Sequence, residues 1–285
     1  MRPLVSVVCA CFNISKYLDE AIASIYAQGY PNLELIVVDD GSTDDTYERL
    51  AMLRERHGFQ LYRQQNQGVS AALNFGLQHA RGNYVATPDL DDIMLPHSLS
   101  VRATYLDQHP EVGCVGALVI YIDSEGQETK RQNGNRIRQL DFDYLLGNAY
   151  VCGAPVSLYR MEALRAAGFY DPEIKVQDFQ MTLRIASQGY QIHKLPVLVT
   201  RYRRHPDNLS RRYKVLLDAD LRTIAPYQSH PAYERGRTEL VNKALKYAVV
   251  ADKRHAWQLL RSLPLRQWNR TTFRRLKRFL LHHES

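Results

Sequence analysis

Residues 33 to 43 read LELIVVDDGST, from Leu33 to Thr43, and this stretch decides the fold. Its first six residues are apolar at every position but one, which is typical of a central strand that helices cover on both faces. Two aspartates, a glycine and a serine follow directly, so the strand ends in a polar turn. In parallel α/β sheets, the turns at the carboxyl ends of the strands hold the ligand. The stretch therefore predicts an α/β sheet with a functional site at one edge.

Strands and helices alternate on either side of this stretch. Further buried strands are expected at 4–11, 60–63 and 84–87. The segments between them carry apolar residues at the three- and four-residue spacing of helices. We expect Asn13 or Ser15 to cap the first helix and Thr43 to begin the second. The alternation predicts a mostly parallel, Rossmann-like sheet flanked by helices, with right-handed crossovers.

The second half of the chain has a different pattern of predicted strands and helices. Beyond residue 111 we expect strands at 112–122, 154–159 and 197–202, helices at 161–167 and 176–188, and a polar, mobile stretch at 127–139. After residue 211 the pattern is helical through to the end, with a break near Pro264. A helical extension therefore follows the α/β part.

Composition excludes several classes of protein. The 285 residues include only 15 glycines and 12 prolines, so a collagenous or disordered chain is excluded. No run of 18 apolar residues occurs, which argues against a transmembrane helix. The apolar run at 3–12 predicts a first strand rather than a secretion signal, because it is short and lacks a small-residue cleavage site. Four cysteines without a C-x-x-C pair predict small core residues in a reducing cytosol, not a zinc site: Cys9, Cys11, Cys114 and Cys152.

The net charge of +7 is unevenly distributed along the chain. Residues 201–285 contain 20 lysines and arginines against 7 aspartates and glutamates, so the preceding 200 residues are acidic overall. Near the end, Phe273, Leu276 and Leu280 form one helical stripe surrounded by basic residues. A basic amphipathic helix suits an anionic membrane surface. The alternative is a solvated helix whose apolar stripe packs on the rest of the protein.

Three aspartates follow another predicted strand, at Asp89, Asp91 and Asp92. Neighbouring carboxylates repel one another unless a cation lies among them, and Mg²⁺ or Mn²⁺ commonly shares its ligand shell with substrate phosphates. The alternative is a solvated turn that caps a helix. Because Asp39 and Asp40 end a neighbouring strand, we favour a metal–diphosphate site. No G-x-G-x-x-G or Walker sequence occurs, which disfavours dinucleotide and P-loop chemistry.

Six motifs in order carry a resemblance to a known family. They are SVVCACFN at 6–13, ELIVVDDGSTD at 34–44, NQG at 66–68, GNYVATPDLDD at 82–92, QD at 177–178 and YRRH at 202–205. Over residues 4–210 the chain resembles a family 2 glycosyltransferase with the GT-A fold, of the bacterial polysaccharide or lipopolysaccharide kind. The resemblance implies inverting transfer of a sugar from a nucleotide diphosphate, with a UDP-sugar favoured, to a hydroxyl of a glycan or lipid-linked acceptor.

The resemblance also implies residue roles. Asp89 and Asp91 match the family's D-x-D and would hold Mn²⁺ or Mg²⁺ against the diphosphate, with Asp92 and His205 as further metal ligands. Asp178 matches the general base, and the start of its predicted helix should favour its ionisation. The residues implied to contact the donor nucleotide are Ala10, Phe12, Asn13, Asp39, Asp40, Asn66, Gly68 and Asp89.

Three departures from the family pattern affect these implied roles. Ala10 and Phe12 stand where the family often has Thr and Tyr, so a hydroxyl contact to the base is missing. The usual Ala-Arg-Asn-x-Gly reads ALNFG at 72–76, which removes a basic side chain near the donor. Gln177 replaces the first acid of a Glu-Asp pair and leaves Asp178 as the only base in that motif. We interpret these departures as tuning donor choice.

The resemblance completes the expected organisation. A glycosyltransferase domain at 1–210 has a nucleotide-binding half at 1–110 and an acceptor-binding half at 111–210, and a helical basic region follows at 211–285. The protein is expected in the cytoplasm, peripherally on the inner face of the membrane, with no nucleic-acid partner. One alternative is an inactive scaffold in carbohydrate assembly. A sugar nucleotidyltransferase is less favoured, because no glycine-rich phosphate loop follows the first strand.

Overall fold

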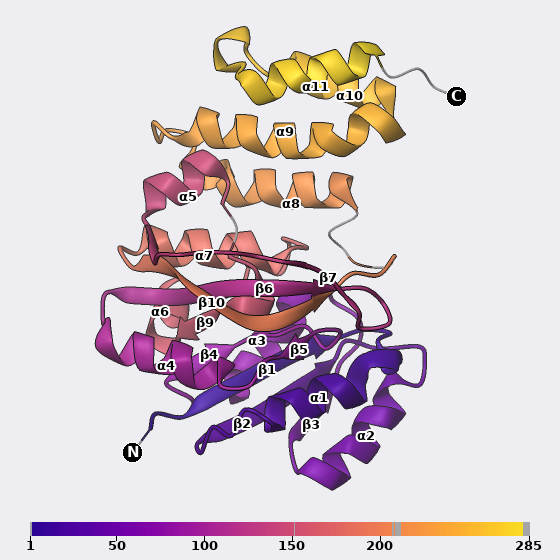
Figure 1. The fold of residues 1–285 in the computed structure, drawn as a ribbon, viewed down its shortest axis with the longest axis vertical. Helices are drawn as coiled ribbons and strands as arrows, with labels where there is room; N and C mark the ends of the chain where they lie inside the picture. Colours follow the sequence, from indigo (N-terminus) through magenta and orange to yellow (C-terminus); the bar gives the residue numbers. More distant parts are fainter. Residues whose placement is uncertain (1, 151, 207, 209–211, 282–285) are drawn as a thin grey trace. The chain divides into compact units, whose positions relative to one another are not determined.

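The computed structural model describes residues 2–150, 152–206, 208 and 212–281 (Figure 1). The chain divides into two compact units. One comprises the residues up to 142 together with 152–205, and the other comprises 143–151 together with 206–285. Each unit is described by itself below.

The first unit is built on one mixed sheet. Its strands lie in the order β3 (Gln60–Arg63), β2 (Leu33–Asp39), β1 (Val5–Cys11), β4 (Tyr84–Ala86), β9 (Leu158–Arg160), β6 (Val112–Ile122), β10 (Gln191–Arg203) and β5 (Ile93–Met94). The first four run parallel to one another, and β6 runs parallel to β10. Between these parallel groups, β9 pairs antiparallel with both β4 and β6. The predicted α/β class and parallel nucleus are therefore confirmed.

Helices pack closely on this sheet (Figure 1). They are α1 (Leu18–Tyr26), α2 (Thr46–His57), α3 (Val69–His79), α4 (Ser98–Gln108), α6 (Met161–Ala166) and α7 (Gln177–Ser187). Helix α3 contacts β1 and β2 at Gly76, where an added Cβ would lie 2.5 Å from Val8 Cγ1 and 3.3 Å from Val38 Cγ2. Both valines are fully buried, and each such side chain contributes about 1.5–3 kcal/mol. The predicted apolar strands thus form the core.

Two helix starts differ from the sequence prediction. The helix expected from Thr43 begins at Thr46, because the Asn13 side chain accepts the backbone N–H of Thr43 at 2.8 Å and holds it outside the helix. The first helix has no side-chain cap from Asn13 or Ser15. A 3₁₀ turn at Ser15–Tyr17 leads directly into α1. Asn13 therefore joins two loops instead of capping its own helix.

The strands beyond residue 111 also differ from the prediction. The polar stretch at 127–139, expected to be mobile, contains β7 (Glu128–Arg131), which pairs with β6, and β8 (Arg138–Leu140), which pairs with β10. The strand expected at 154–159 is shorter, because Pro155 lies in a 3₁₀ turn at Ala154–Val156 before β9. The last strand is longer than expected and runs from Gln191 to Arg203. Backbone pairing with long neighbouring strands overrides the polar composition here.

The second unit is helical, as predicted. It contains α5 (Phe142–Asn148, whose first residue belongs to the other unit), α8 (Tyr213–Ile224), α9 (Tyr233–Ala251), α10 (Lys253–Ser262) and α11 (Arg270–Leu281). Helix α9 is central and contacts α8, α10 and α11 (Figure 1). The break expected near Pro264 separates α10 from α11. Among the described residues, no helix combines the length and apolarity that crossing a bilayer requires.

Candidate active site

Three polar segments meet at the carboxyl edge of the parallel strands. Cys11 pairs with Asp39 across β1 and β2, so residues 12–13 and 40–42 leave adjacent strand ends together. Strand β4 flanks β1 on its other side and leads into the acidic segment at 89–92. The convergence expected from the sequence is therefore present, and this edge is the position at which such sheets bind ligands.

Asp40 organises the loop that follows β3. Its side chain is 3% exposed. Its Oδ1 accepts the side-chain amide of Gln64 at 2.7 Å and the backbone N–H of Gln67 at 2.9 Å, and its Oδ2 accepts the N–H of Gly68 at 2.8 Å. Asn66 and Gly68 lie exposed on this loop. The Asp40 carboxylate therefore fixes the position of this loop beside the site.

Asp39 lies deeper than Asp40 and is fully buried. Its Oδ1 accepts the backbone N–H of Ser42 at 3.2 Å, and the Nε of Arg63 lies 3.1 Å from its Oδ2. The guanidinium also donates from Nη2 to the carbonyl of Ser42. Asp39 thus shapes the 41–42 turn and places one cation beside it.

The end of β1 presents an aromatic ring to solvent. Phe12 is 47% exposed, so much of its ring is open to solvent. Ala10 is half-buried in the strand behind it, and the exposed Asn13 donates its backbone N–H to Ser42 at 2.9 Å. An exposed ring on a rigid, hydrogen-bonded edge is suited to stacking against a planar ligand.

The acidic segment brings three carboxylates together. One oxygen each of Asp89, Asp91 and Asp92 lies within 4.8 Å of the others. Burial raises the pKa of the Asp89 and Asp92 carboxyls well above the usual range, and the charge of Asp91 raises both further. The cluster is therefore electrostatically unfavourable when all three groups are ionised.

Two residues at the end of β10 hold this segment in place: Arg203, the last residue of the strand, and His205, just beyond it. The backbone N–H of Arg203 donates to Asp92 Oδ1 at 2.7 Å, and its Nε donates to the Asp91 carbonyl at 2.8 Å. The Nη2 of the same guanidinium donates to Glu20 at 2.6 Å. The Nε2 of His205 lies 3.0 Å from Asp91 Oδ2, and the ring is 8% exposed. Residues far apart in sequence thus fix the carboxylate geometry.

The donor set fits a hard divalent cation. Asp92 Oδ2 is buried and has no hydrogen-bond partner, which is costly for a carboxylate oxygen. Carboxylate oxygens are the ligands that Mg²⁺ and Mn²⁺ prefer, and a divalent charge would offset the repulsion among the three groups. Asp89, Asp91 and Asp92 could hold such an ion, with His205 beside it.

Asp178 lies in the first turn of α7, half-buried near the acidic segment. Its Oδ1 accepts the backbone N–H of Ala154 at 2.9 Å. Burial raises the pKa of this carboxyl to about 6, although the hydrogen bond from Ala154 opposes the shift. The expectation that the helix start favours ionisation is therefore wrong, because burial outweighs the helix terminus. A carboxylate with a raised pKa is a stronger base.

Asp178 is within electrostatic reach of the cluster. After burial and Asp91, its charge is a further cause of the raised pKa of Asp89. Asp178 and the metal-binding candidates thus share one region within a single compact unit. This arrangement can place a proton acceptor beside a metal-bound group.

Sequence reasoning underestimated Arg203. The motif gave it no role of its own, whereas its side chain is 3% exposed and donates to Asp91 and Glu20. The signal was its position in the YRRH motif, two residues before His205. The roles of Gln64 and the Ala154 N–H were also missed, and neither carries a sequence signal.

Comparisons with known proteins identify the family and the fold of the chain. The model of Glycosyl transferase family 2 matches residues 6–168. The amylovoran biosynthesis glycosyltransferase AmsE of Erwinia amylovora is 29% identical over 217 residues, which cover 73% of this chain and 79% of AmsE. Two solved structures, both under 25% identical, match in fold.

The first of these structures is residues 1–349 of S. aureus TarS in complex with UDP-GlcNAc. It has a TM-score of 0.68 at 18% identity, with 93% of this chain and 82% of that chain covered. The chain spans 50% of the longer TarS structure. The second is the Pyrobaculum calidifontis mannosyltransferase PcManGT in complex with GDP-Man and Mn²⁺, with a TM-score of 0.61 at 22% identity and 98% and 87% coverage. The expected GT-A fold is confirmed, and since the family model spans more than half of the chain, the protein belongs to glycosyl transferase family 2.

Proposed function

We propose that the protein transfers a sugar, with inversion, from a nucleoside diphosphate sugar to a hydroxyl of a glycan or lipid-linked acceptor in bacterial surface polysaccharide synthesis. The observation that carries this proposal is the meeting of three carboxylates with a half-buried Asp178 at one sheet edge. We place donor binding in residues 1–110 and acceptor binding in 111–210. AmsE, named for amylovoran biosynthesis, supports the assignment to polysaccharide synthesis.

The donor would lie across the ends of β1, β2 and β4. Phe12 would stack on the base, Asp39 and Asp40 would hold the nucleoside, and the loop at 66–68 that Asp40 fixes would close the base pocket. Ala10 and Asn13 would contact the nucleotide from β1. We favour a UDP-sugar, because TarS, which shares the fold, binds UDP-GlcNAc.

The chemistry would run between the carboxylates and Asp178. Asp89, Asp91, Asp92 and His205 would hold Mn²⁺ or Mg²⁺. When bound, the ion would stabilise the negative charge that develops on the leaving diphosphate. Asp178 would accept the proton of the acceptor hydroxyl as that oxygen attacks the anomeric carbon from the side opposite the diphosphate. A base raised to a pKa of about 6 is ionised at neutral pH and still basic enough to assist.

The test is release of nucleoside diphosphate from a panel of UDP-, GDP- and dTDP-sugars, with Mn²⁺, Mg²⁺ or EDTA. We expect turnover with at least one donor, dependent on metal, and its loss in Asp91→Asn. The matched control is Asp218→Asn, which removes an exposed carboxylate from α8. Metal-dependent donor binding without turnover across all donors and acceptors would support the inactive scaffold instead.

We also infer that the basic helical region binds an anionic membrane surface, where a lipid-linked acceptor resides, and that the protein acts on the inner face of the cell membrane. On α11, Phe273 and Leu280 are 57% and 63% exposed, whereas Thr272 is buried against Asn242 of α9. Lys277 and Arg278 are exposed on the same helix. Charges near an anionic surface contribute about 1 kcal/mol each.

Vesicle sedimentation tests this inference. Lys277→Gln/Arg278→Gln should weaken binding to phosphatidylglycerol vesicles by about thirtyfold at low salt, since two charges are lost. The control Arg54→Gln/Arg56→Gln removes two exposed charges from α2 and should have little effect. Equal binding by both variants would show that α11 does not contact the membrane.

A further inference from the structure

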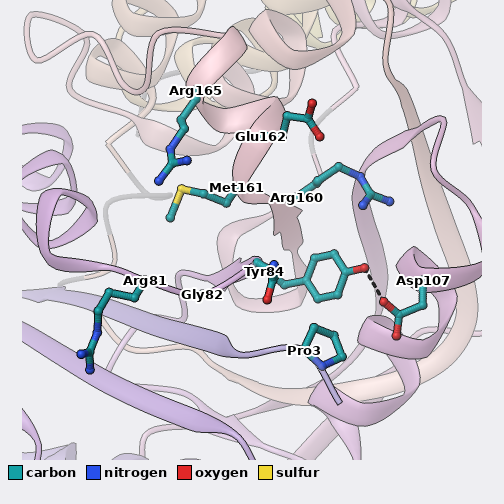
Figure 2. A pocket seen from close by; sticks show the side chains of 10 residues that line it. Pro3, Arg81, Gly82, Tyr84, Asp107, Arg160, Met161, Glu162 and Arg165 are labelled. Carbon is teal, nitrogen blue, oxygen red and sulfur yellow. Dashed lines mark hydrogen bonds between the residues drawn. The ribbon is translucent and has the colours of Figure 1, made fainter. Parts of the chain in front are cut away.

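Two of the cavities in the first unit lie beside the strands of its sheet, away from the acidic cluster. Figure 2 shows one of about 340 Å³ near the start of β4, lined by three arginines and by Asp107 and Glu162. Its polar groups largely pair within the protein. Tyr84 donates its hydroxyl to Asp107 at 2.6 Å, and Arg160 donates to three backbone carbonyls. This cavity is a structural feature of the sheet.

The second cavity is different in charge. It has a volume of about 400 Å³ and lies among β6, β7, β8 and β10, and we call it the basic hollow. Five cationic side chains line it: Lys130, Arg131, Arg136, Arg138 and Lys194. Among the described residues that line it, none carries a carboxylate. Arg131 is paired with Glu128 outside the lining, at 2.6 Å.

Strand pairing concentrates this charge. Arg138 lies directly opposite Lys194 in the antiparallel register of β8 and β10. An anionic ligand bound between the strands would be attracted by both side chains. The volume is within the range of small-molecule sites and is large enough for one charged sugar unit.

A short segment lies near both Asp178 and the strand that pairs with Lys194. Lys194 pairs with Gly116 on β6, and a Cβ at Gly116 would lie 1.9 Å from Cys152 Sγ. One residue further on, an added Cβ at Gly153 would lie 3.8 Å from Asp178 Oδ2. Cys152 and Gly153 therefore lie between this strand and the proposed base.

The electrostatics of Cys152 agree with this proximity. A hydrogen bond with Cys114 is the largest cause that lowers the pKa of the Cys152 thiol, Lys194 lowers it as well, and Asp178 raises it. Lys194 and Asp178 are therefore both near Cys152. The basic hollow also lies in the 111–210 half, in which we place acceptor binding.

We propose that the basic hollow is an acceptor subsite that binds an anionic group, a carboxylate or a phosphate, on a sugar unit behind the one that is glycosylated. The proposal rests on the proposed function in taking the ligand to be the acceptor. It adds a substrate class, because it makes the acceptor an acidic glycan. Lysine and arginine donate strong, charge-assisted hydrogen bonds to both anionic groups.

The experiment is calorimetric titration without donor or metal. The probes are a hyaluronan tetrasaccharide for carboxylate, a glycerol phosphate oligomer for phosphate, and neutral chitotetraose. The variant is Lys130→Gln/Arg136→Gln, which alters two exposed side chains that stand apart from the acidic cluster and Asp178. The control Arg54→Gln/Arg56→Gln removes the same charge from α2.

We expect one anionic probe to bind at least about tenfold more tightly than chitotetraose at low salt, and the hollow variant to lose about tenfold of that affinity. The control should retain it. Whichever anionic probe binds identifies carboxylate or phosphate as the ligand group.

Three results would overturn the proposal. They are equal binding of charged and neutral probes, equal loss in the variant and the control, and loss of phosphatidylglycerol vesicle binding in the hollow variant without loss of glycan binding. The last would make the hollow a membrane contact. Because titration needs no turnover, absence of nucleoside diphosphate release with intact anion binding would count against the proposed function alone.

Discussion

Replacing Asp178 by asparagine should make the protein more stable and nearly inactive. The carboxyl has a pKa of about 6 in the folded protein, raised by burial from 3.8 in the unfolded chain. The difference corresponds to about 3 kcal/mol, at 1.36 kcal/mol per pKa unit, which is an upper value because the side chain is only half-buried. Asparagine keeps an oxygen that can accept the Ala154 N–H and removes the charge.

The sign follows from the raised pKa of an acid. Below pH 3.8 the carboxyl is protonated in both states and costs nothing. Between pH 3.8 and about 6 the unfolded state releases its proton first, so wild-type stability falls as pH rises. Above pH 6 the full cost is present. The variant should therefore be up to about 3 kcal/mol more stable at pH 8 and equal to wild type near pH 4.

Urea denaturation in EDTA at pH 4, 6 and 8 measures this difference directly. Parallel assays should show donor affinity nearly unchanged and sugar transfer reduced by about two to four orders of magnitude, since general-base assistance is lost. A variant that is equal to or less stable than wild type at pH 8 would refute the argument that burial strains the charge. Stabilisation that persists at pH 4 would show that its cause is not ionisation. Equal loss of donor affinity would place Asp178 in the wrong site.

Three further changes have defined outcomes. In the wild-type protein, the transfer rate should fall about tenfold for each pH unit below pH 6, because Asp178 takes up a proton there. A transfer rate that does not change between pH 6 and lower pH would exclude Asp178 as the base. Arg203→Gln should weaken Mn²⁺ binding by about 10- to 100-fold in calorimetry, because the Asp91 carbonyl loses its hydrogen bond. Unchanged Mn²⁺ affinity would mean that the acidic segment keeps its geometry without Arg203. Gly76→Ala should destabilise the protein by about 1–3 kcal/mol in urea, because its Cβ would meet Val8, and a neutral result would show that α3 can shift.

The parallel half of the sheet was predictable because its signals are local. Apolar runs such as Val5–Cys11 and Leu33–Asp39 can be stable only when buried on both faces, and the polar turns after them mark the strand ends. The strands beyond residue 111 were less predictable. Strand β7 is short and polar and forms a local hairpin with β6, whereas the equally short β8 pairs with β10, which is far away in sequence. No residue within 127–139 indicates the partner of β8.

The same distinction applies to the site. Asp89, Asp91 and Asp92 adjoin one another in sequence, so their proximity required no knowledge of the fold. Asp178 was placed in the region by resemblance, but its protonation was misjudged, because a helix start can be read from sequence whereas burial by surrounding segments cannot.

Arg203 shows why the supporting contacts could not be derived from sequence. Its backbone and guanidinium bond Asp92, Asp91 and Glu20, residues separated from it by 111, 112 and 183 positions. A buried guanidinium is stable only when its N–H groups are hydrogen-bonded. The buried Arg203 side chain therefore keeps these contacts and holds the acidic segment in one position. Arg203 thereby ties the end of β10 to the acidic segment and to α1 within the first unit. The carboxylates have this geometry only when β10 is in place, and the order of the motifs in the sequence does not predict that dependence.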